Sequence, residues 1–381
     1  MKIDPANAFS GVLKFLMSAR LVFWLMPALM ALLVAGTVSQ HWIGLYGAHK
    51  MFFSSFVLWI GPLPLPGGYI LLGLLSLGLS LKFFLKSRWA WRKAGVILAH
   101  LGALILLVGG LVTALAAHES FMILPEGAES RFVYDYTQRD FVVYEDQREI
   151  LRVPFQDLEH LDARARTAGL PFAIKLKNIC ANCKIVSRAE TEEGFEEGLV
   201  YHSMAKGAAL VPEPQGKEPE EDMPGLSFVI EGAGKSENGD VQDGYYVAFD
   251  SMPKVIAINS QNKNYQIVFG KRQSQLPFSV TLKDFVKDSY SGMEMARDYH
   301  SDVIIRDGDL VWPVRIGMNE PLRYRGYTLF QSSFQRTPDA EMSIFAVVEN
   351  KGWLVPYIGT FVIGAGLILH LISVLLGWRR S

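Results

Sequence analysis

Four long stretches of the chain are almost free of charged side chains. Roughly twenty apolar residues in a helix cross the hydrocarbon layer of a membrane, so each stretch predicts a membrane span. The second stretch contains Lys82, which lies near its end and can reach the membrane interface with its long side chain. The predicted spans are Leu21–Ser39, Gly68–Leu85, Ala94–Ala117 and Leu354–Trp378.

Between the third and the fourth span the pattern changes to short runs of Val, Ile, Tyr and Phe, separated by turn residues, which is typical of strands. The predicted fold class is therefore an integral membrane protein with four helical spans and a large β-rich extracytoplasmic domain between spans three and four. The predicted domains are residues 1–117, 118–353 and 354–381. Leu170–Asn178 (LPFAIKLKN) resembles Leu276–Asp284 (LPFSVTLKD), which suggests that the β domain has two halves.

Two segments do not fit either pattern. Met51–Gly61 is apolar but too short to span, and three prolines follow it, so we expect an interfacial or re-entrant segment on the outer side. Ala189–Gly225 is rich in acidic residues and proline, which predicts a solvated, flexible loop.

The charge distribution predicts the orientation in the membrane. Residues 1–118 contain one acidic residue and nine Lys or Arg, whereas residues 119–352 contain 37 acidic and 26 basic residues, a balance of −11. Because basic residues favour the cytoplasmic side, we expect both termini in the cytoplasm, residues 118–353 outside it, and a location in the cytoplasmic (inner) membrane. The acidic insert argues against a nucleic-acid partner.

Two histidines lie inside the apolar stretches. His100 is about 9 Å and His370 about 12 Å from the predicted cytoplasmic ends of their spans, so we expect the two at nearly one level. Small residues share the face of each histidine. An ionisable group inside a span indicates function, and paired imidazoles with room between helices can hold the iron of a b-type haem. The alternatives are structural hydrogen bonds, or haem ligation together with a partner protein's histidine.

Cys180 and Cys183 are the only cysteines and form a C-x-x-C motif. Lys184 stands where covalent haem attachment would need a histidine, so the motif is not a haem attachment site. In an oxidising compartment such a pair forms either a structural disulfide or an exchange-active dithiol. Both interpretations stay open.

Three segments near the end of the insert resemble the ResB (CcsB) family of System II cytochrome c biogenesis. They are LPFSVTLKDF (Leu276–Phe285), YHSDVIIRDG (Tyr299–Gly308) and MNEPLRYRGYTLFQSSF (Met318–Phe334). The third-span sequence that begins at His100 and the order of spans and outer domain are also similar to that family. The motif residues that carry the resemblance are Asn319, Pro321, Leu322, Gly326, Gln331, Ser332 and Ser333.

The resemblance implies a haem-handling and export subunit. Such proteins act with a CcsA (ResC)-type membrane partner, and together they deliver haem for covalent attachment to apocytochrome c. The chain would be one component of a cytochrome c haem lyase and not an enzyme alone. His100 and His370 would bind haem b transiently, and a periplasmic thiol reductant is a further candidate partner. Two other functions stay open: a membrane b-type haem electron carrier, and a membrane-anchored scaffold without catalysis.

Overall fold

The structure is a computed structural model of the 381-residue chain. It describes residues 5–86, 90–190, 195, 198–236, 239–252, 254–290, 296–337 and 340–377. The chain divides into two compact units. The helical unit comprises Met1–His118 and Val348–Ser381, and the β unit comprises Glu119–Val347.

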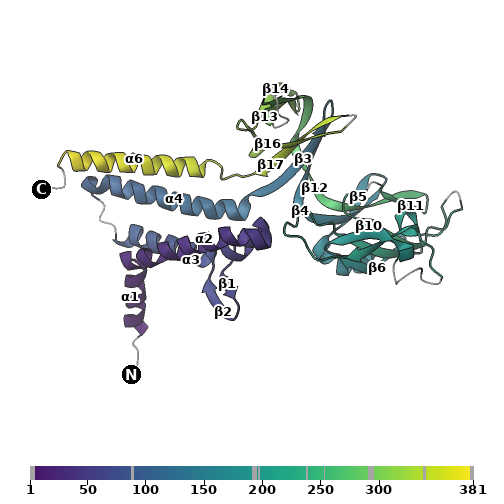
Figure 1. The fold of residues 1–381 in the computed structure, drawn as a ribbon, viewed down its shortest axis with the longest axis horizontal. Helices are drawn as coiled ribbons and strands as arrows, with labels where there is room; N and C mark the ends of the chain where they lie inside the picture. The colour runs from purple at the N-terminus through teal and green to yellow at the C-terminus, as the bar shows by residue number, and fades with distance from the viewer. Residues whose placement is uncertain are drawn as a thin grey trace. The chain divides into compact units, whose positions relative to one another are not determined.

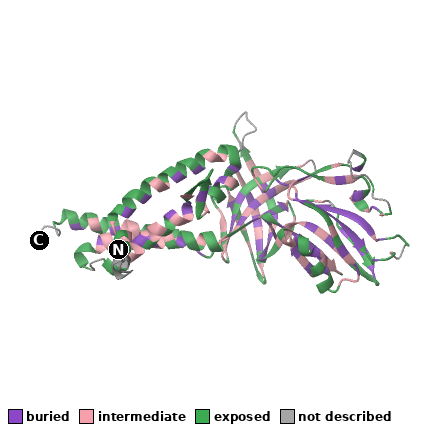
Figure 2. Ribbon diagram, turned by 90° about the horizontal axis from the view of Figure 1, so that it is seen from below, coloured by how far each residue is buried: buried purple, intermediate pink, exposed green. Residues whose placement is uncertain are grey.

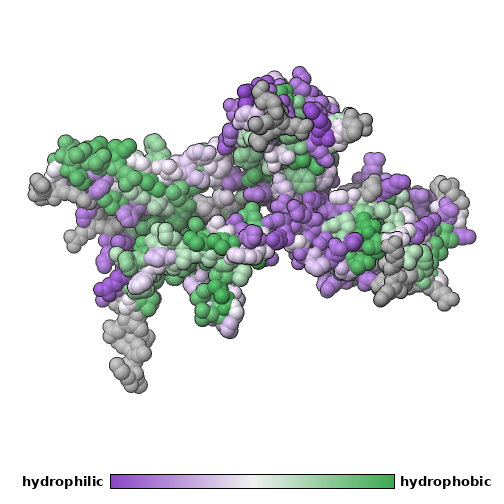
Figure 3. Space-filling view, viewed as in Figure 1, coloured by the Kyte–Doolittle hydropathy of each residue, from purple (hydrophilic) through white to green (hydrophobic). Residues whose placement is uncertain are grey.

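In its described part, the helical unit contains five α-helices (Figure 1). Among the described residues, four helical segments are long and apolar enough to cross a membrane, namely those built on α2, α3, α4 and α6. Their outward surfaces are largely hydrophobic (Figure 3), so the chain is a multi-pass membrane protein. The α-helices are α1 (Pro5–Leu16), α2 (Ala19–Ala48), α3 (Gly68–Leu81), α4 (Ala94–Ala116) and α6 (Val355–Leu375), with short turns η1 (His49–Phe53), η2 (Lys82–Lys86) and η3 (Trp91–Lys93).

The first span is longer than the apolar stretch that predicted it. Helix α2 begins after Ser18, whose hydroxyl accepts a hydrogen bond from the backbone N–H of Leu21 (3.4 Å), a typical N-cap. It continues beyond Ser39 to Ala48, with a non-helical residue at Gly44 (φ 76°). Hydropathy identifies only the part of a helix that can lie in lipid. The helix itself ends where capping and backbone geometry end it, so α2 continues into polar residues beyond the apolar stretch.

The segment predicted as interfacial or re-entrant contains a small hairpin. Strands β1 (Val57–Ile60) and β2 (Leu63–Pro66) pair antiparallel around Gly61, whose φ of +60° suits glycine. Trp59 and Leu63 leave more than half of their surface exposed. The location of this hairpin relative to a membrane stays a prediction.

The closest helix pair in the helical unit is α4 with α6, and glycines make the contact. A Cβ atom built on Gly102 would lie 2.7 Å from the carbonyl oxygen of Gly359, and one on Gly366 would lie 2.5 Å from the backbone nitrogen of Ala99. Gly95, one heptad before Gly102, faces the backbone of His370, and Gly109, one heptad after it, faces the side chain of Val355. The two helices thus approach closely along two heptads, with backbone against backbone at Gly95 and Gly102, as in other membrane helix pairs with small residues at the interface.

The β unit is built on two long strands, β4 and β12, which pair with each other in a ten-stranded sheet (Figure 1). A separate three-stranded sheet has the order β10-β9-β6, and β7 pairs with β8. The strands are β3 (His118–Pro125), β4 (Glu129–Glu145), β5 (Arg148–Pro154), β6 (Ala173–Cys180), β7 (Cys183–Ser187), β8 (Ala208–Pro212), β9 (Gly225–Glu231), β10 (Gly244–Phe249), β11 (Ile256–Ser260), β12 (Lys263–Ser289), β13 (Ala296–Asp307), β14 (Leu310–Gly317), β15 (Leu322–Tyr324), β16 (Tyr327–Arg336) and β17 (Glu341–Glu349), with helix α5 (Leu161–Thr167) and short turns η4 (Phe155–His160), η5 (Arg188–Glu190) and η6 (Ser203–Lys206).

Among the described residues, three buried clusters form the interior of the β unit: the first contains Phe141, the second Phe278 and the third Tyr245. The strands of this unit carry most of its buried residues (Figure 2). The two similar nonamers lie in different clusters. Phe172 and Ile174 belong to the first cluster, and Phe278 and Val280 belong to the second. The nonamers therefore share a pattern of alternating inward-facing side chains, although their strands belong to different sheets.

The stretch Ala189–Gly225 is not one flexible loop in its described part. It contains β8, which pairs with β7, and the buried residues Tyr201 and Ala205. The prediction was wrong here because acidic composition does not reveal the apolar residues that anchor a segment locally. Residues 191–194 and 196–197 lie outside the described part of the chain.

Candidate functional site

His100 lies on α4 in a chemically defined orientation. Its Nδ1 atom is 2.7 Å from the backbone carbonyl oxygen of Val96, one helical turn earlier. A carbonyl oxygen can only accept a hydrogen bond, so Nδ1 carries the proton and donates it. The lone pair of the neutral ring is then on Nε2, and a backbone carbonyl of this kind commonly orients a metal-binding histidine.

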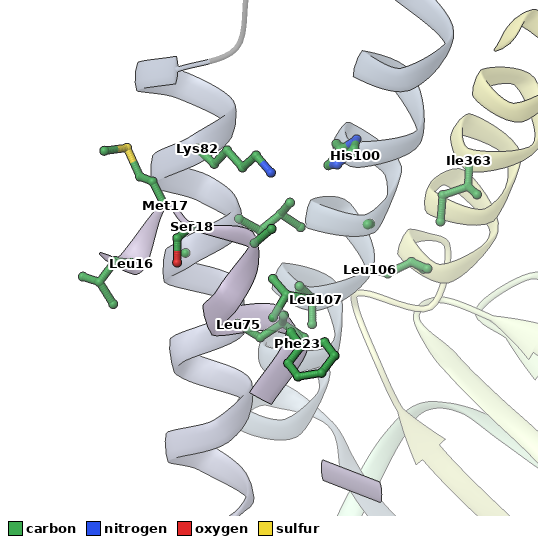
Figure 4. A pocket seen from close by; sticks show the side chains of 15 residues that line it. Leu16, Met17, Ser18, Phe23, Leu75, Lys82, His100, Leu106, Leu107 and Ile363 are labelled. Carbon is green, nitrogen blue, oxygen red and sulfur yellow. The ribbon is translucent and has the colours of Figure 1, made fainter. Parts of the chain in front are cut away.

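The imidazole lines an apolar cavity of about 640 Å³ within the helical unit (Figure 4). This volume lies within the range of small-molecule sites, which are mostly apolar with few polar groups. Helices α2, α3 and α4 supply most of its wall, and Ile363 of α6 completes it. The other lining residues are Leu16, Met17, Ser18, Ala19, Val22, Phe23, Leu75, Gly78, Leu79, Lys82, Ala103, Leu106 and Leu107.

Lys82 is the cation of this cavity. It follows the last residue of α3, and Figure 4 shows its side chain extending toward His100. From the sequence, Lys82 was interpreted only as an interfacial lysine. The signal that could have identified it is the charge itself, because a charged residue inside an apolar stretch is costly and usually functional.

His370 does not line this cavity. A Cβ atom built on Gly95 would lie 2.4 Å from the backbone nitrogen of His370, so His370 is level with Gly95. His100 is five residues further along α4, which corresponds to about 8 Å along the axis and about 140° around it. The backbones of the two histidines are therefore about 8 Å apart along the helix axis, instead of the roughly 3 Å that the ends of the apolar stretches predicted. Ligation of one haem by both imidazoles stays a prediction. The glycine contact, and not the ends of the apolar stretches, fixes the register of α4 against α6.

The small residues on the His370 face of α6 were expected to leave room for haem, but they make the contact with α4 instead. Gly359 and Gly366 receive the backbone of α4, so they do not leave room for a macrocycle between α4 and α6. On α4, the small residues that face α6 are Gly95, Gly102 and Gly109, and not the residues that share the face of His100. The cavity beside His100 opens instead toward α2 and α3.

Cys180 and Cys183 form a disulfide that joins the end of β6 to the start of β7. Both sulfur-bearing residues are buried. Between them, Asn182 donates a hydrogen bond to the carbonyl of Pro214 (2.8 Å) and accepts one from the backbone N–H of Met223 (3.1 Å). The bridged turn therefore holds both ends of the acidic segment 214–223, whereas an exchange role for the two cysteines stays a prediction.

The family motif residues form a hairpin and its support. Arg325 (φ 48°) and Gly326 (φ 84°) are the two turn residues between β15 and β16, and two positive φ values in a two-residue turn favour glycine. Pro321 and Leu322 lead into this hairpin, and Asn319 is an exposed turn residue before it. Ser332 and Ser333 are exposed on β16.

Gln331, near the end of the motif, belongs to a buried hydrogen-bond network. Its side-chain oxygen accepts a hydrogen bond from the buried Ser301 hydroxyl (2.6 Å), and its amide donates to the carbonyl of Ser333 (3.0 Å). The Ser301 hydroxyl is also 2.6 Å from that of Ser343, which is fully buried. This network joins β13, β16 and β17, and a buried polar network costs stability unless every member is paired. Gln331 and Gly326 therefore have structural roles in the β unit.

The fold defines this chain as a multi-pass membrane protein with a large β-rich domain. Its described part has four apolar helical segments, and the β unit is inserted between the third and the fourth of them. Residues 247–371 match the family model of the ResB-like family. The resemblance to the ResB family is thereby confirmed over this range, which includes His370 and the hairpin motif but not His100.

A curated relative shows a shorter similarity. Protein NrfI of Wolinella succinogenes is 31% identical over 109 residues. The aligned segment covers 28% of this chain and 12% of NrfI. The similarity therefore spans only about an eighth of the length of that relative.

Proposed function

We propose that the chain is a haem-handling subunit of cytochrome c biogenesis, which carries haem on its way to covalent attachment outside the cytoplasm. The ResB-like match supports the process. The observation that carries the haem proposal is the cavity beside His100, whose ring has its proton on Nδ1 and its lone pair on Nε2.

The residues of the cavity fit the chemistry of haem as cargo. Haem is a planar apolar molecule whose iron takes axial nitrogen ligands and whose propionates carry negative charge. The cavity offers apolar walls, one imidazole nitrogen and the ammonium group of Lys82. His100 would supply an axial nitrogen oriented by the carbonyl of Val96, and Lys82 would pair with a carboxylate. Leu and Val side chains around them would exclude water.

The second axial ligand would come from a partner in this proposal. His370 does not line the cavity, so a histidine of a CcsA (ResC)-type membrane protein is the better candidate. The basic segments would lie in the cytoplasm and the β unit outside the inner membrane. The β unit would then contact apocytochrome c or the partner. A thiol reductant would be needed only to keep the cysteines of apocytochrome c reduced.

The test is the absorbance spectrum of the purified full-length chain after addition of haem, alone and with the partner. We expect haem to bind wild type and His370→Ala but not His100→Ala. In His100→Gly, free imidazole should restore the spectrum because it can occupy the space of the deleted ring. Lys82→Met should weaken haem binding, and His41→Ala on the exposed outer part of α2 serves as the control.

Two outcomes would overturn the proposal. If His100→Ala binds haem as wild type does and matures a reporter cytochrome c normally, His100 is not a ligand. If the isolated wild-type chain retains haem through washing with excess imidazole and needs no partner, a resident electron-carrier haem explains the site better.

A further inference from the structure

A second cavity lies in the β unit, where the pairing of β4 with β12 is interrupted. Lys271 pairs with Arg139, and Gln273 pairs with Tyr134, so four residues of β4 stand opposite the single residue Arg272. The carboxylate of Asp135 fixes this bulge by accepting hydrogen bonds from the backbone N–H groups of residues 137 and 138, each 2.8 Å long. Bulges that interrupt a sheet often accompany binding sites, because they redirect side chains.

The cavity has a volume of about 380 Å³ and a largely aromatic and aliphatic wall. Phe121 and Tyr134 belong to that wall, with their ring centroids 5.8 Å apart, and the Phe121 centroid is also 5.1 Å from that of Tyr136, which does not line the cavity. Tyr144 and Phe269 also line the cavity. Rings in this arrangement offer flat surfaces to a planar ligand.

The two carboxylates of the cavity are already paired. Asp140 is buried and accepts hydrogen bonds from Arg152 (2.8 Å) and from Arg272 (2.8 Å and 2.9 Å). Asp250 accepts one from the buried Arg139 (3.0 Å). These carboxylates are therefore not available to a further cation, and they leave the remaining lysine without a close anion.

That lysine is Lys271. Its ammonium nitrogen lies 4.8 Å from the centroid of the Phe121 ring, a cation–π contact. Within the described ranges no carboxylate comes within 4 Å of it. Burial and the nearby Arg139 lower the pKa of Lys271, against the opposing effect of Asp250, Glu220 and Asp135. A half-buried ammonium without a close carboxylate can pair with an incoming anion through charge-assisted hydrogen bonds, which are stronger than hydrogen bonds between neutral groups.

We propose that this cavity binds a small ligand in which a carboxylate is joined to an aromatic body. The carboxylate pairs with Lys271, and the aromatic body lies against Phe121 and Tyr134. The site is in the β unit and independent of the His100 cavity, so it goes beyond the haem proposal. Its chemistry matches the general form of ligand pockets, with apolar walls and one or two oriented polar groups.

The test uses 2-naphthoate as the probe and methionine methyl NMR of the full-length chain in detergent. Met252 lines the β-unit cavity, whereas Met17 lines the His100 cavity. We expect 2-naphthoate to shift the Met252 methyl resonance, which Met252→Leu assigns, and to leave Met17 unchanged. Lys271→Met should weaken the effect on Met252 about tenfold or more, because it removes one charged hydrogen bond.

Three controls make the result specific. Lys287→Met is the matched variant, since Lys287 also lies over an aromatic ring (5.1 Å from the Phe334 centroid) but does not line the cavity. It should bind 2-naphthoate as wild type does. The neutral analogue 2-naphthalenemethanol and the small anion acetate should each bind much more weakly than 2-naphthoate.

The proposal is overturned if Met252 does not respond to 2-naphthoate, or if Lys271→Met responds at the wild-type concentration. It is also overturned if the neutral analogue binds equally well. A response at Met17 alone would place the aromatic probe in the His100 cavity instead. None of these results depends on haem binding, so failure here and failure of the haem proposal are distinguishable.

Discussion

The helical unit and the β unit hold their interiors together by opposite means. In the helical unit, α4 and α6 approach so closely that backbone meets backbone, and glycines make this possible. In the β unit, the pairing of the two longest strands is accompanied by a cluster of ionised side chains around Asp140 and Asp250. The contact between α4 and α6 depends on the absence of side chains at glycines. The region around β4 and β12 depends on ionised side chains that are paired with one another.

The comparison shows where polar groups are informative. In the helical unit polar side chains are scarce, so His100 and Lys82 in one apolar cavity already indicate a ligand. In the β unit ionised side chains are common and many are paired, so a charge alone is not informative. Lys271 is informative because it lines a cavity with aromatic walls and no carboxylate of the described residues lies within 4 Å of it. The following predictions test each side of this comparison.

The largest effect is expected from Gly102→Leu. A leucine there would place its Cβ 2.7 Å from the Gly359 carbonyl and 2.6 Å from the Ile363 side chain, and backbone atoms cannot rotate away. We expect a loss of about 3 kcal/mol or more in the free energy of unfolding, measured by thermal unfolding in detergent. Gly110→Leu is the control, because a Cβ on Gly110 meets nothing within 4 Å. Equal stability of the two variants would contradict a contact made by glycines.

Asp140→Asn should have the next largest effect. The substitution removes the charge that pairs with Arg152 and Arg272, while the two guanidinium groups keep about a third of their surface in water. We expect a loss of about 2 to 3 kcal/mol in urea unfolding. The control Asp302→Asn removes the exposed pair with Arg315 and should cost less than about 1 kcal/mol.

The loss of stability in Asp140→Asn should depend on pH in a defined direction. Burial alone would raise the pKa of Asp140, but hydrogen bonds from Arg272 and Arg152 outweigh it, and the pKa lies below its ordinary value. A depressed carboxyl pKa stabilises the folded state above the unfolded value of about 3.9. The difference between wild type and Asp140→Asn should therefore be largest near neutral pH and shrink below about pH 4. A difference that grows on acidification would show that the ion cluster does not stabilise the fold.

The smallest effect is expected from replacing both Cys180 and Cys183 with Ser. The disulfide closes a loop of only four residues, which corresponds to about 2 kcal/mol of stabilisation. Because both residues are buried, a thiolate reaches the sulfurs poorly, and we expect maturation of a reporter cytochrome c to stay unchanged. A maturation defect under oxidising growth with unchanged thermal unfolding would instead indicate disulfide exchange.

Much of the architecture was predictable, and the reasons are physical. Long apolar stretches predicted the four spanning helices, and alternating Val, Ile, Tyr and Phe predicted a β-rich unit. The motif Met318–Phe334 carries the ResB resemblance. In the structure its turn residues and the buried Gln331 hold the hairpin of β15 and β16 in place. Helix α1 was missed although its sequence is amphipathic, because it is too short for a span, and β8 was missed because it lies within an acidic, proline-rich stretch.

His100 was predicted as a site residue from the sequence, but its surroundings were not. A histidine within an apolar stretch can be read directly from the sequence. Because an ionisable side chain is costly in lipid, its presence there indicates a function. The cavity, the hydrogen bond to Val96 and the neighbouring Lys82 appear only after α2, α3 and α4 have been packed together. The offset between the backbones of His370 and His100 follows from the register that the glycine contact imposes.

The sequence by itself determined the spans, the β-rich insert, the charge asymmetry and the family motif, because hydropathy, alternation and turn chemistry are local properties. Only the tertiary structure decided which helix faces meet, which histidine lines a cavity, and that Lys271 faces an aromatic wall without a close carboxylate. These facts depend on contacts between residues that are far apart in the chain, and no local pattern encodes the register of such contacts.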